Sequence, residues 1–461
     1  QVSQSFAGQV IADSAISSTK ENFSPLFLNI LNLWMTFPFF PVILFTVSCS
    51  EINMRDGKTM WRNRNVWIII SGEFIAGVGL WIGIIGNLEF MQERVPSDFV
   101  KSLILASGIL AGIMASPLAG RMIDTYRKKT ILLCSGFFRI ISVLFMFIAL
   151  AADSVAWMVV FLIAMQLSAA FYFPALQAAI PLIVKENELL AVNGAHMNAG
   201  TLARIAGTAI GGSLLLFLSL PMLYLCSIFA YILLFIFTFF LRIDESPGRA
   251  GQKADAKKER GFQEVMPAIK SRPAILMTLI IVLMPLLMIG GFNLIVINIS
   301  EIYGDPSVKG LVYTTEGISF MLGAYFVKKI SARRSPFAIL GFFSLLMSLG
   351  EILLFFVHFK ILLFLSFVLF GFSIGCIFPT AATIFQTKMP KEYHGRFFSF
   401  RNMLERIGFQ VVLLGTGFLL DTIGLPCMVL IYGSLSLLIT VLFSAKLRKT
   451  GAKREAGMLR F

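Results

Sequence analysis

The sequence predicts an all-α membrane protein with twelve transmembrane helices in two six-helix halves, and leaves room for an extra N-terminal apolar segment. Three observations predict this fold class. The composition is too apolar for a soluble protein, long apolar runs alternate with short loops of alternating charge, and the second half of the chain repeats features of the first.

The composition points to a bilayer. Of the 461 residues, 57% are hydrophobic and 14% are charged, with a mean hydropathy of +0.83. Soluble domains carry about 25% charged residues. The net charge of +14 comes from Lys and Arg in short loops, where they orient helices against anionic lipid. We therefore expect a multi-pass protein of the cell membrane whose partner is the lipid bilayer, and no nucleic-acid partner.

Residues 1–65 form an N-terminal extension of uncertain status. Residues 26–49 are apolar and long enough to span a bilayer, although Pro38 and Pro41 interrupt them. Three interpretations stay open: an extra spanning helix, a processed leader, or sequence absent from the mature protein. A leader begins with basic residues, and only Lys20 precedes this block, so that match is poor.

Twelve apolar runs follow. The predicted N-terminal half, 66–241, holds runs at 66–88, 100–122, 130–151, 155–183, 196–218 and 221–241. A basic, polar linker at 242–273 contains eight Lys or Arg and no apolar run. The predicted C-terminal half, 274–445, holds runs at 274–299, 307–327, 336–357, 361–385, 398–420 and 425–445, and a basic tail occupies 446–461.

Loop charge orients these runs. The cation-rich loops carry Arg127, Lys128, Lys129, the linker cluster, Lys328, Lys329, Arg333, Arg334, Lys388, Lys391 and Arg396. The opposite loops hold only Arg94, Lys101, Lys309 and Lys360. Because cytoplasmic loops carry the excess of Lys and Arg, we expect both ends of the twelve-helix body in the cytoplasm.

The two halves share a pattern. Pro174 in the fourth run and Pro379 in the tenth both follow Phe and precede small residues, and each is expected to kink its helix. Arg204 and Arg406 each follow their proline by a similar distance. Matched kinks and matched charges are typical of a duplicated transporter.

The loop from Gly120 to Thr130 joins the second and third runs. Asp124 follows Gly120 by four residues, and Arg127 and Lys128 come shortly after. This spacing resembles the signature loop between helices 2 and 3 of the major facilitator superfamily, although Arg127 stands where that pattern usually has a second Gly. The resemblance implies a conformational latch on the cytoplasmic side, in which Gly120 permits close helix approach and Asp124 accepts hydrogen bonds. An ordinary basic loop is the alternative.

The resemblance extends from about Asn63 to Arg448. Within it, residues 168–175, 177–181 and 189–193 resemble the macrolide-efflux branch of drug:proton antiporters. The resemblance implies alternating access around a midplane site, a small-molecule substrate, protons as the coupling ion and no cofactor. One departure is that the fourth run offers Gln166 in place of an Arg set early in helix 4.

The fifth run resembles the antiporter motif Gly-Pro-x-x-Gly-Gly, with Thr208 replacing the proline. We expect its glycines to let this helix pack tightly where the halves meet, either as ordinary packing or as part of antiport; they are Gly207, Gly211 and Gly212.

Ionisable residues inside apolar runs are the best candidates for coupling, because charge in hydrocarbon is costly. Glu73 is the first candidate to load and release a proton, with a structural pair to Arg204 as the alternative. Glu316 is the second candidate, and Arg204 is the third. Glu405 is interpreted as structural because Arg401 precedes it by four residues. Glu351 is expected to reach the outer interface.

By resemblance, helices 1, 4, 7 and 10 line the central cavity. The polar groups available there are Gln166, Tyr172, Gln177, Asn293, Asn298 and Thr380, together with Thr383. The many Phe and Met residues around them suit irregular apolar ligands, although most are expected to face lipid.

Taken together, the sequence predicts a secondary active transporter that exports amphipathic drugs or small metabolites by proton-coupled alternating access. No phosphate-binding loop, catalytic elbow or metal-ligand spacing occurs, so neither an enzyme, a cofactor nor a metal is expected. We expect a monomer. The alternatives are a membrane sensor or scaffold that moves nothing, and an importer or lipid translocator of the same fold.

Overall fold

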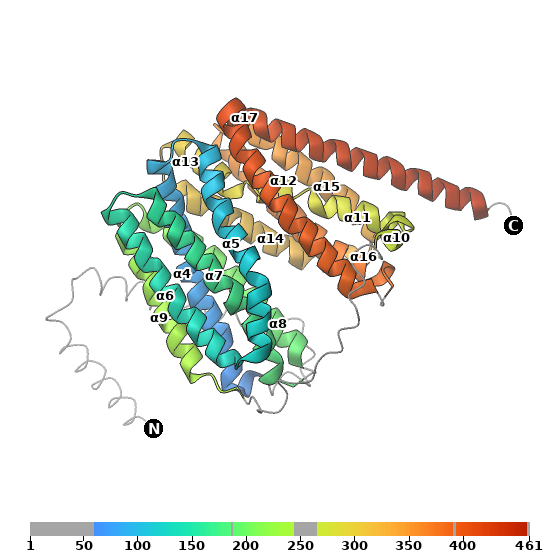
Figure 1. Cartoon of the computed structure of the whole chain (residues 1–461). Coiled ribbons are helices and arrows are strands. Elements are labelled where there is room, and N and C mark those ends of the chain that lie inside the picture. The colour runs from blue at the N-terminus through green and yellow to red at the C-terminus, as the bar shows by residue number, and fades with distance from the viewer. Residues whose placement is uncertain (1–59, 186–187, 244–264, 391–392, 459–461) are drawn as a thin grey trace, which may run out of the picture. The chain divides into compact units, whose positions relative to one another are not determined.

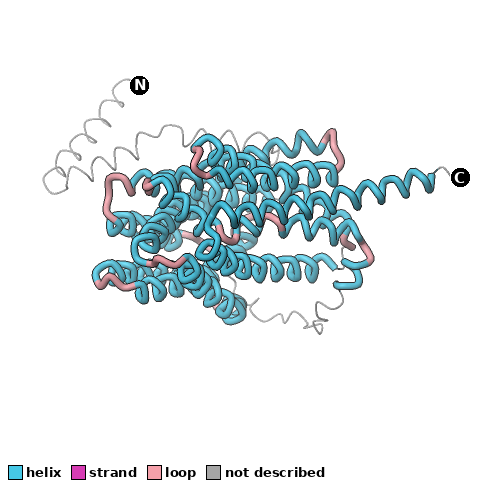
Figure 2. The backbone as a smooth tube through the Cα atoms, turned by 90° about the horizontal axis from the view of Figure 1, so that it is seen from above, coloured by secondary structure: helices cyan, strands magenta, loops and turns pink. Residues whose placement is uncertain are grey.

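The computed structural model describes residues 60–185, 188–243, 265–390 and 393–458. The predictions for residues 1–59, for most of the linker at 242–273 and for the last three residues of the tail lie outside this part. Within the described ranges, every regular element is a helix, and short loops join them (Figure 2). The all-α prediction is confirmed for this part of the chain.

The first group of helices follows the predicted runs closely. It begins with a 3-10 turn, η1 (Met60–Arg62), and comprises α4 (Arg64–Arg94), α5 (Asp98–Thr125), α6 (Lys128–Ala151), α7 (Val155–Ala179) with η2 (Ile180–Leu182), α8 (Leu189–Leu214) and α9 (Leu220–Phe240). Short polar residues begin two of these helices, because the side chain of Asn63 accepts from the amide of Asn65, and that of Ser97 from the amide of Val100.

The second group is less regular. It comprises α10 (Val265–Lys270), α11 (Pro273–Leu283), α12 (Leu286–Ile289), α13 (Phe292–Tyr303), α14 (Ser307–Ser331), α15 (Pro336–Leu353) with η5 (Leu354–Phe356), α16 (Lys360–Lys388) and α17 (His394–Met458). The predicted seventh run is thus three short helices, broken before Pro285 and at Gly290 and Gly291. Pro174 and Pro379 lie inside the continuous helices α7 and α16.

A turn divides α17 into two arms (Figure 1). Gly424 has φ +73° and ψ 170°, a conformation that L side chains rarely adopt. The residues before and after it correspond to the last two predicted runs. The second arm continues to Met458, well past the predicted end of the last run at 445.

Nine stretches of the described residues are long and apolar enough to cross a membrane. One is Pro273–Tyr303, which joins α11 to α13, and another is Phe400–Ala445, which contains the turn in α17. The helices α8 and α14 are of spanning length but are not among the nine. Their lower apolarity has a structural reason: they pack against each other.

Helix packing repeats from one half to the other (Figure 1). In the first half α5 and α6 pack on α7, and α6 packs on α9. In the second half α14 and α15 pack on α16, and α15 packs on α17. The most extensive contacts between the halves are α8 against α14 and α5 against α17, and α13 also contacts α4 and α5. In the order of the predicted runs, α14 corresponds to α5, and the first arm of α17 corresponds to α8. The α8–α14 and α5–α17 contacts are therefore equivalent, as expected of a duplicated bundle.

Candidate functional site

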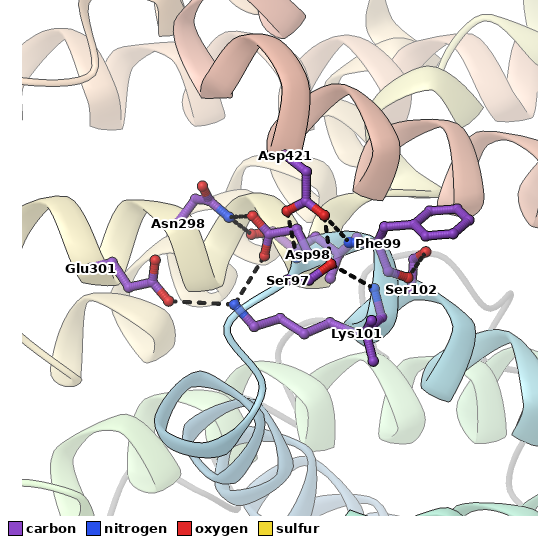
Figure 3. A network of polar contacts seen from close by, with 10 residues as sticks. Ser97, Asp98, Phe99, Lys101, Ser102, Asn298, Glu301 and Asp421 are labelled. Carbon is purple, nitrogen blue, oxygen red and sulfur yellow. Dashed lines mark hydrogen bonds and ion pairs between the residues drawn. The ribbon is translucent and has the colours of Figure 1, made fainter.

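Asp421 holds the start of α5 from the turn of α17. Its carboxylate accepts from Ser97 Oγ at 2.6 Å, from the amide of Asp98 at 2.7 Å and from the amide of Phe99 at 3.0 Å (Figure 3). A carboxylate at a helix N-terminus satisfies amides that lack a partner within the helix and interacts favourably with the helix dipole. This contact ties the second half of the chain to the first.

Buried charges extend this contact to α13. Lys101 is 1% exposed, and its Nζ lies 2.9 Å from Asp98 Oδ1 and 3.5 Å from Glu301 Oε1. Asn298 donates to Asp98 Oδ2 at 2.8 Å (Figure 3). Buried ions are tolerated only when they are paired and hydrogen-bonded. We call Ser97, Asp98, Lys101, Asn298, Glu301 and Asp421 the end network.

A second ion pair lies at the same end of the bundle. Lys309, near the start of α14, is fully buried, and its Nζ lies 2.6 Å from Glu89 Oε2 near the end of α4. The same amine donates to Ser300 Oγ at 2.9 Å. Residues from the α4–α5, α13–α14 and α17 turns therefore close this end. The loop-charge pattern predicts that it faces away from the cytoplasm.

A third link between the halves is a salt bridge from α8 to α14. Arg204 Nη1 lies 2.6 Å from Glu316 Oε2, and Glu316 is 5% exposed. Trp81 lies beside this pair, with its ring 5.9 Å from the Arg204 guanidinium carbon and 5.6 Å from the Tyr313 ring. Tyr313 in turn donates to Asn293 Oδ1. Two of the three coupling candidates are thus paired with each other.

Glycines bring α8 and α14 together at backbone distance. A Cβ added to Gly212 would lie 2.7 Å from the Gly310 Cα, and a Cβ added to Gly310 would lie 2.9 Å from the Gly212 Cα. Neither position has room for a side chain. We call Gly212, Gly310, Arg204 and Glu316 the α8–α14 contact. Close packing of Gly212 where the halves meet is what the sequence predicts.

The other two glycines of the motif pack within the first half. A Cβ on Gly207 would lie 2.7 Å from the Val78 carbonyl oxygen, and one on Gly211 would lie 3.2 Å from the Ile82 Cα. Both therefore bring α8 close to α4.

Glu73 has a different neighbour from the one considered for it. Its Oε2 lies 3.4 Å from His196 Nε2 on α8, whereas Arg204 is paired with Glu316. The alternative of a Glu73–Arg204 pair is therefore wrong for this structure. The Glu73–His196 contact joins α4 to α8 within the first half, so Glu73 does not itself link the halves here.

The predicted cavity residues are not all in one place. Gln166 and Gln177 are exposed on α7, and Thr380 is buried and donates to the carbonyl of its own helix at Cys376. Asn293 meets Tyr313, as described above. Asn298 belongs to the end network, because the broken seventh run places it near the end of α13 beside Asp98.

The predicted latch loop is open in this structure. Gly120 is exposed and a Cβ there would meet nothing within 4 Å, so the close helix approach expected at Gly120 is absent from this conformation. Asp124 lies in the last turns of α5, but its side chain is outside the described set. Arg127 is exposed in the gap before α6, which begins at Lys128. The latch stays a prediction.

Arg139 is a buried cation that the sequence did not rank. It is 4% exposed on α6, and its guanidinium carbon lies 4.8 Å from the Tyr172 ring and 5.5 Å from the Tyr231 ring. Its Nε has no hydrogen-bond partner among the described residues. A desolvated cation–π contact contributes roughly 2 kcal/mol, whereas burying an ion costs several. The rings offset only part of this cost.

The carboxylates outside the links gave mixed outcomes. Glu405 lies 2.6 Å from Arg401 one turn away, which confirms the interpretation of a same-helix pair. The expectation that Glu351 reaches the outer interface is wrong. It is 2% exposed, and neither carboxyl oxygen has a partner in the described part of the structure. Glu351 is buried because α17 packs against this end of α15.

The end network is what sequence reasoning missed. Lys101 appears in the sequence as a loop cation, and Asp98 and Asp421 as ordinary residues at run boundaries. The signal available in the sequence was the spacing of two opposite charges, since Asp98 and Lys101 are three residues apart at a helix start. Among the described residues no group of His, Cys, Asp and Glu suits a metal ion.

This geometry defines a class of protein: a membrane bundle of two similar halves, joined by ion pairs that separate only if the halves move. The sequence profile of the Major Facilitator Superfamily matches residues 25–413 and, in a second match, 286–458. The chain belongs to this superfamily. It is an integral membrane transporter and not an enzyme.

Relatives and solved structures agree with this assignment. The chain is 25% identical to the uncharacterized MFS-type transporter YfiS of Bacillus subtilis, over 83% of this chain and 93% of that one. It is 22% identical to macrolide efflux protein A of Streptococcus pyogenes, over 83% and 94%.

Two solved structures share the fold. The nucleoside transporter NupG matches with a TM-score of 0.63 at 16% identity, covering 83% of this chain and 98% of that one. A bacterial homologue of the iron transporter ferroportin in its inward-facing state matches with a TM-score of 0.63 at 11% identity, covering 83% and 98%.

Proposed function

We propose that this transporter exports amphipathic drugs or small metabolites in exchange for protons, by rocking two six-helix halves around a central site. The observation that carries the proposal is the Arg204–Glu316 salt bridge, which crosses between the halves beside the Gly212–Gly310 crossing. A protonatable group that also holds the halves together can couple proton binding to their movement.

The chemistry follows from charge balance. When the buried Glu316 takes up a proton it becomes neutral, and the partly buried Arg204 cation loses its partner. Removing one member of a buried pair costs about 3–5 kcal/mol, so protonation disfavours the conformation in which they meet. A shift of that size is enough to reverse a two-state population. Glu73, beside His196, is proposed as a second proton carrier.

The remaining assignments complete this proposal. We assign twelve spans by adding α8 and α14 to the nine apolar stretches and by counting the two arms of α17 as separate spans. The halves are taken as 66–241 and 274–445, with a cytoplasmic linker and tail. The end network then lies on the outer face of the cell membrane, and the latch at Gly120, Asp124, Arg127 and Lys128 on the cytoplasmic face. The likeness to a macrolide efflux protein supports export as the direction.

Proteoliposomes with an imposed pH gradient test the proposal. We expect the wild type to move a macrolide such as erythromycin against the proton flow, and Glu316→Gln to abolish the dependence on the gradient while the protein still folds. Glu73→Gln measures the share of the second carrier. Macrolide movement with the proton flow would make this an importer. Flux unaffected by any gradient would contradict proton coupling altogether.

A further inference from the structure

A recess inside the first half has features of a ligand site that the proposed function does not use. It has a volume of about 240 Å³ and lies among α4, α6, α7 and α9. Arg139 of α6 lines it, as do Asn87 of α4 and Gln166 of α7. Gln166 and Phe173 are exposed, so the recess can be reached along α7.

The polar groups of the recess are hydrogen-bond donors set in an apolar wall. Asn87 Oδ1 accepts from Tyr224 at 2.9 Å, which orients the amide and leaves its NH₂ group as a donor. Ser227, also in the lining, donates to the Gly79 carbonyl. None of the residues that line the recess is acidic. The recess therefore offers a positive charge and amide donors, but no built-in anion.

The contacts of Arg139 indicate which chemical group the recess is suited to bind. Its guanidinium is buried, its Nε is unsatisfied within the described residues, and it lies over the rings of Tyr172, Phe173 and Tyr231. A guanidinium presents a planar fork of donors that matches a carboxylate in two parallel hydrogen bonds. Aromatic faces satisfy part of its charge and none of its donors.

We propose that the recess binds the carboxylate end of an amphipathic organic acid, with Arg139 as the anion-binding residue and Leu80, Val143, Phe161 and Met165 around the apolar body. The inference rests on the proposed function in one respect, because it names organic anions as a substrate class of the same transporter. Drug-sized sites measure about 300–1,000 Å³, so this recess holds the head and first ring of such a molecule.

Glu73 is the carboxylate of this chain that could pair with Arg139 in place of the carboxylate of a ligand. It acts electrostatically on Tyr172, the residue on which Arg139 lies, but it is placed beside His196. If Glu73 were the counter-ion of Arg139 in another conformation, removing its charge would strengthen anion binding. The test therefore includes Glu73→Gln, for which a rise in anion affinity would identify Glu73 as that counter-ion.

The experiment measures equilibrium binding to the full chain in lipid nanodiscs, without any gradient. The probes are phenylbutyrate, phenylbutanol and phenylbutylamine, which share a body and differ in charge. We expect phenylbutyrate to bind best, and Arg139→Gln to weaken it about 10- to 100-fold, the loss expected for charge-assisted hydrogen bonds. Arg139→Lys, which keeps the charge but not the fork, is expected to fall between the two. The alcohol should bind both proteins alike, whereas the amine, a cation that the guanidinium repels, should bind Arg139→Gln better than the wild type.

Ala169 of α7 also lines the recess, and Ala169→Leu provides a variant that keeps the cation and fills the recess. It should weaken phenylbutyrate as Arg139→Gln does, and it tests the site even if Arg139→Gln fails to fold. Arg401→Gln, which breaks the same-helix pair with Glu405 on α17, should leave phenylbutyrate affinity within twofold. Equal affinity for the three probes, no binding of phenylbutyrate to the wild type, or binding untouched by Ala169→Leu would each overturn the proposal. Because no flux is measured, anion binding without macrolide transport would contradict only the proposed function.

Discussion

The two crossings between the halves correspond by position in the duplicated bundle but are held together differently. At the α8–α14 contact, Gly212 faces Gly310 at backbone distance and one salt bridge lies beside them. At the crossing of α5 and α17, Gly417 also lies close, since a Cβ there would be 2.7 Å from the Asp98 carbonyl oxygen. There, however, the Asp421 carboxylate of α17 also binds Ser97 and the first amides of α5, and Asp98 and Lys101 extend the end network from α5 to α13.

This difference suggests how the halves move. Side-chain hydrogen bonds and ion pairs can be exchanged for water at modest net cost, so the end network can open and close. At a glycine crossing, water cannot replace the contact in this way. The two backbones fit by shape, and there are no side chains that could rearrange. We infer that the Gly212–Gly310 crossing acts as the pivot, about which Arg204 and Glu316 can separate, and that the end network acts as the gate. Four substitutions separate these roles.

The largest effect is expected from removing the charge that Arg204 faces. Glu316→Ala should lower the free energy of unfolding by about 3 kcal/mol, the lower end of the range for breaking a buried pair, since it leaves the guanidinium of Arg204, whose side chain is 22% exposed, without its partner. Chemical denaturation of the purified protein in detergent measures it. Glu405→Ala is the matched control, because it breaks a same-helix pair whose side chains are 19% and 28% exposed and should cost about 0.3–0.5 kcal/mol. Equal losses in the two variants would remove the special role of the crossing pair.

The second effect tests shape alone. Gly310→Ala places a methyl group against the Thr208 carbonyl and Gly212. Overpacking of this kind costs about 1–3 kcal/mol. If the cost falls on one conformer, it also shifts the conformational equilibrium by about 5- to 150-fold, so transport should change more than stability. Gly194→Ala on α8 is the control, because a Cβ there meets nothing within 4 Å. A Gly310→Ala protein with normal stability and flux would show that the glycine crossing is not a pivot.

Much of this arrangement was within reach of the sequence. Apolar runs located the helices, and Gly-x-x-x-Gly-Gly spacing predicted tight packing of Gly212, because small residues in membrane helices have few other uses. The Arg401–Glu405 pair followed from helical spacing. All three depend on local periodicity, which the sequence states directly.

The partners across the halves were beyond that reasoning. Arg204 and Glu316 are 112 residues apart, and nothing in the periodicity of either helix ranks one distant partner above another. Asn298 was expected in the cavity, but the breaks before α13 set it at the end of the bundle. Glu351 is buried because α17 turns at Gly424 and covers it. Each outcome depends on how whole helices are placed.

The third effect is expected at the gate. Asp421→Asn keeps one acceptor for the start of α5 but removes the charge and the second acceptor. Losing a helix cap costs about 0.5–2 kcal/mol of stability. Because the amide oxygen of the introduced Asn can still accept one hydrogen bond, we expect a cost near the lower end of this range. The gate should open more often, so a cysteine introduced at Ser102, which is fully buried, should react faster with a water-soluble maleimide than in the parent. The reference is Asp153→Asn, which removes an exposed partner of Arg94. Unchanged labelling would mean that Asp421 does not hold the gate.

The smallest effect concerns the turn before Lys309, whose ion pair with Glu89 lies at the same end of the bundle as the gate. Asp305 Oδ1 accepts from the amide of Ser307 at 2.9 Å and from its hydroxyl at 2.6 Å, and these hydrogen bonds lower the pKa of Asp305 below its ordinary value. A lowered folded-state pKa contributes stability above the unfolded pKa, and this contribution is lost as pH falls through the folded value. Asp305→Asn should therefore lower the melting temperature slightly at pH 7 and not at all at the acid end, where wild type and variant converge. A gap between them that persists below the folded pKa would show that the side chain acts through shape, and that Lys309 is not positioned by the charge of this turn.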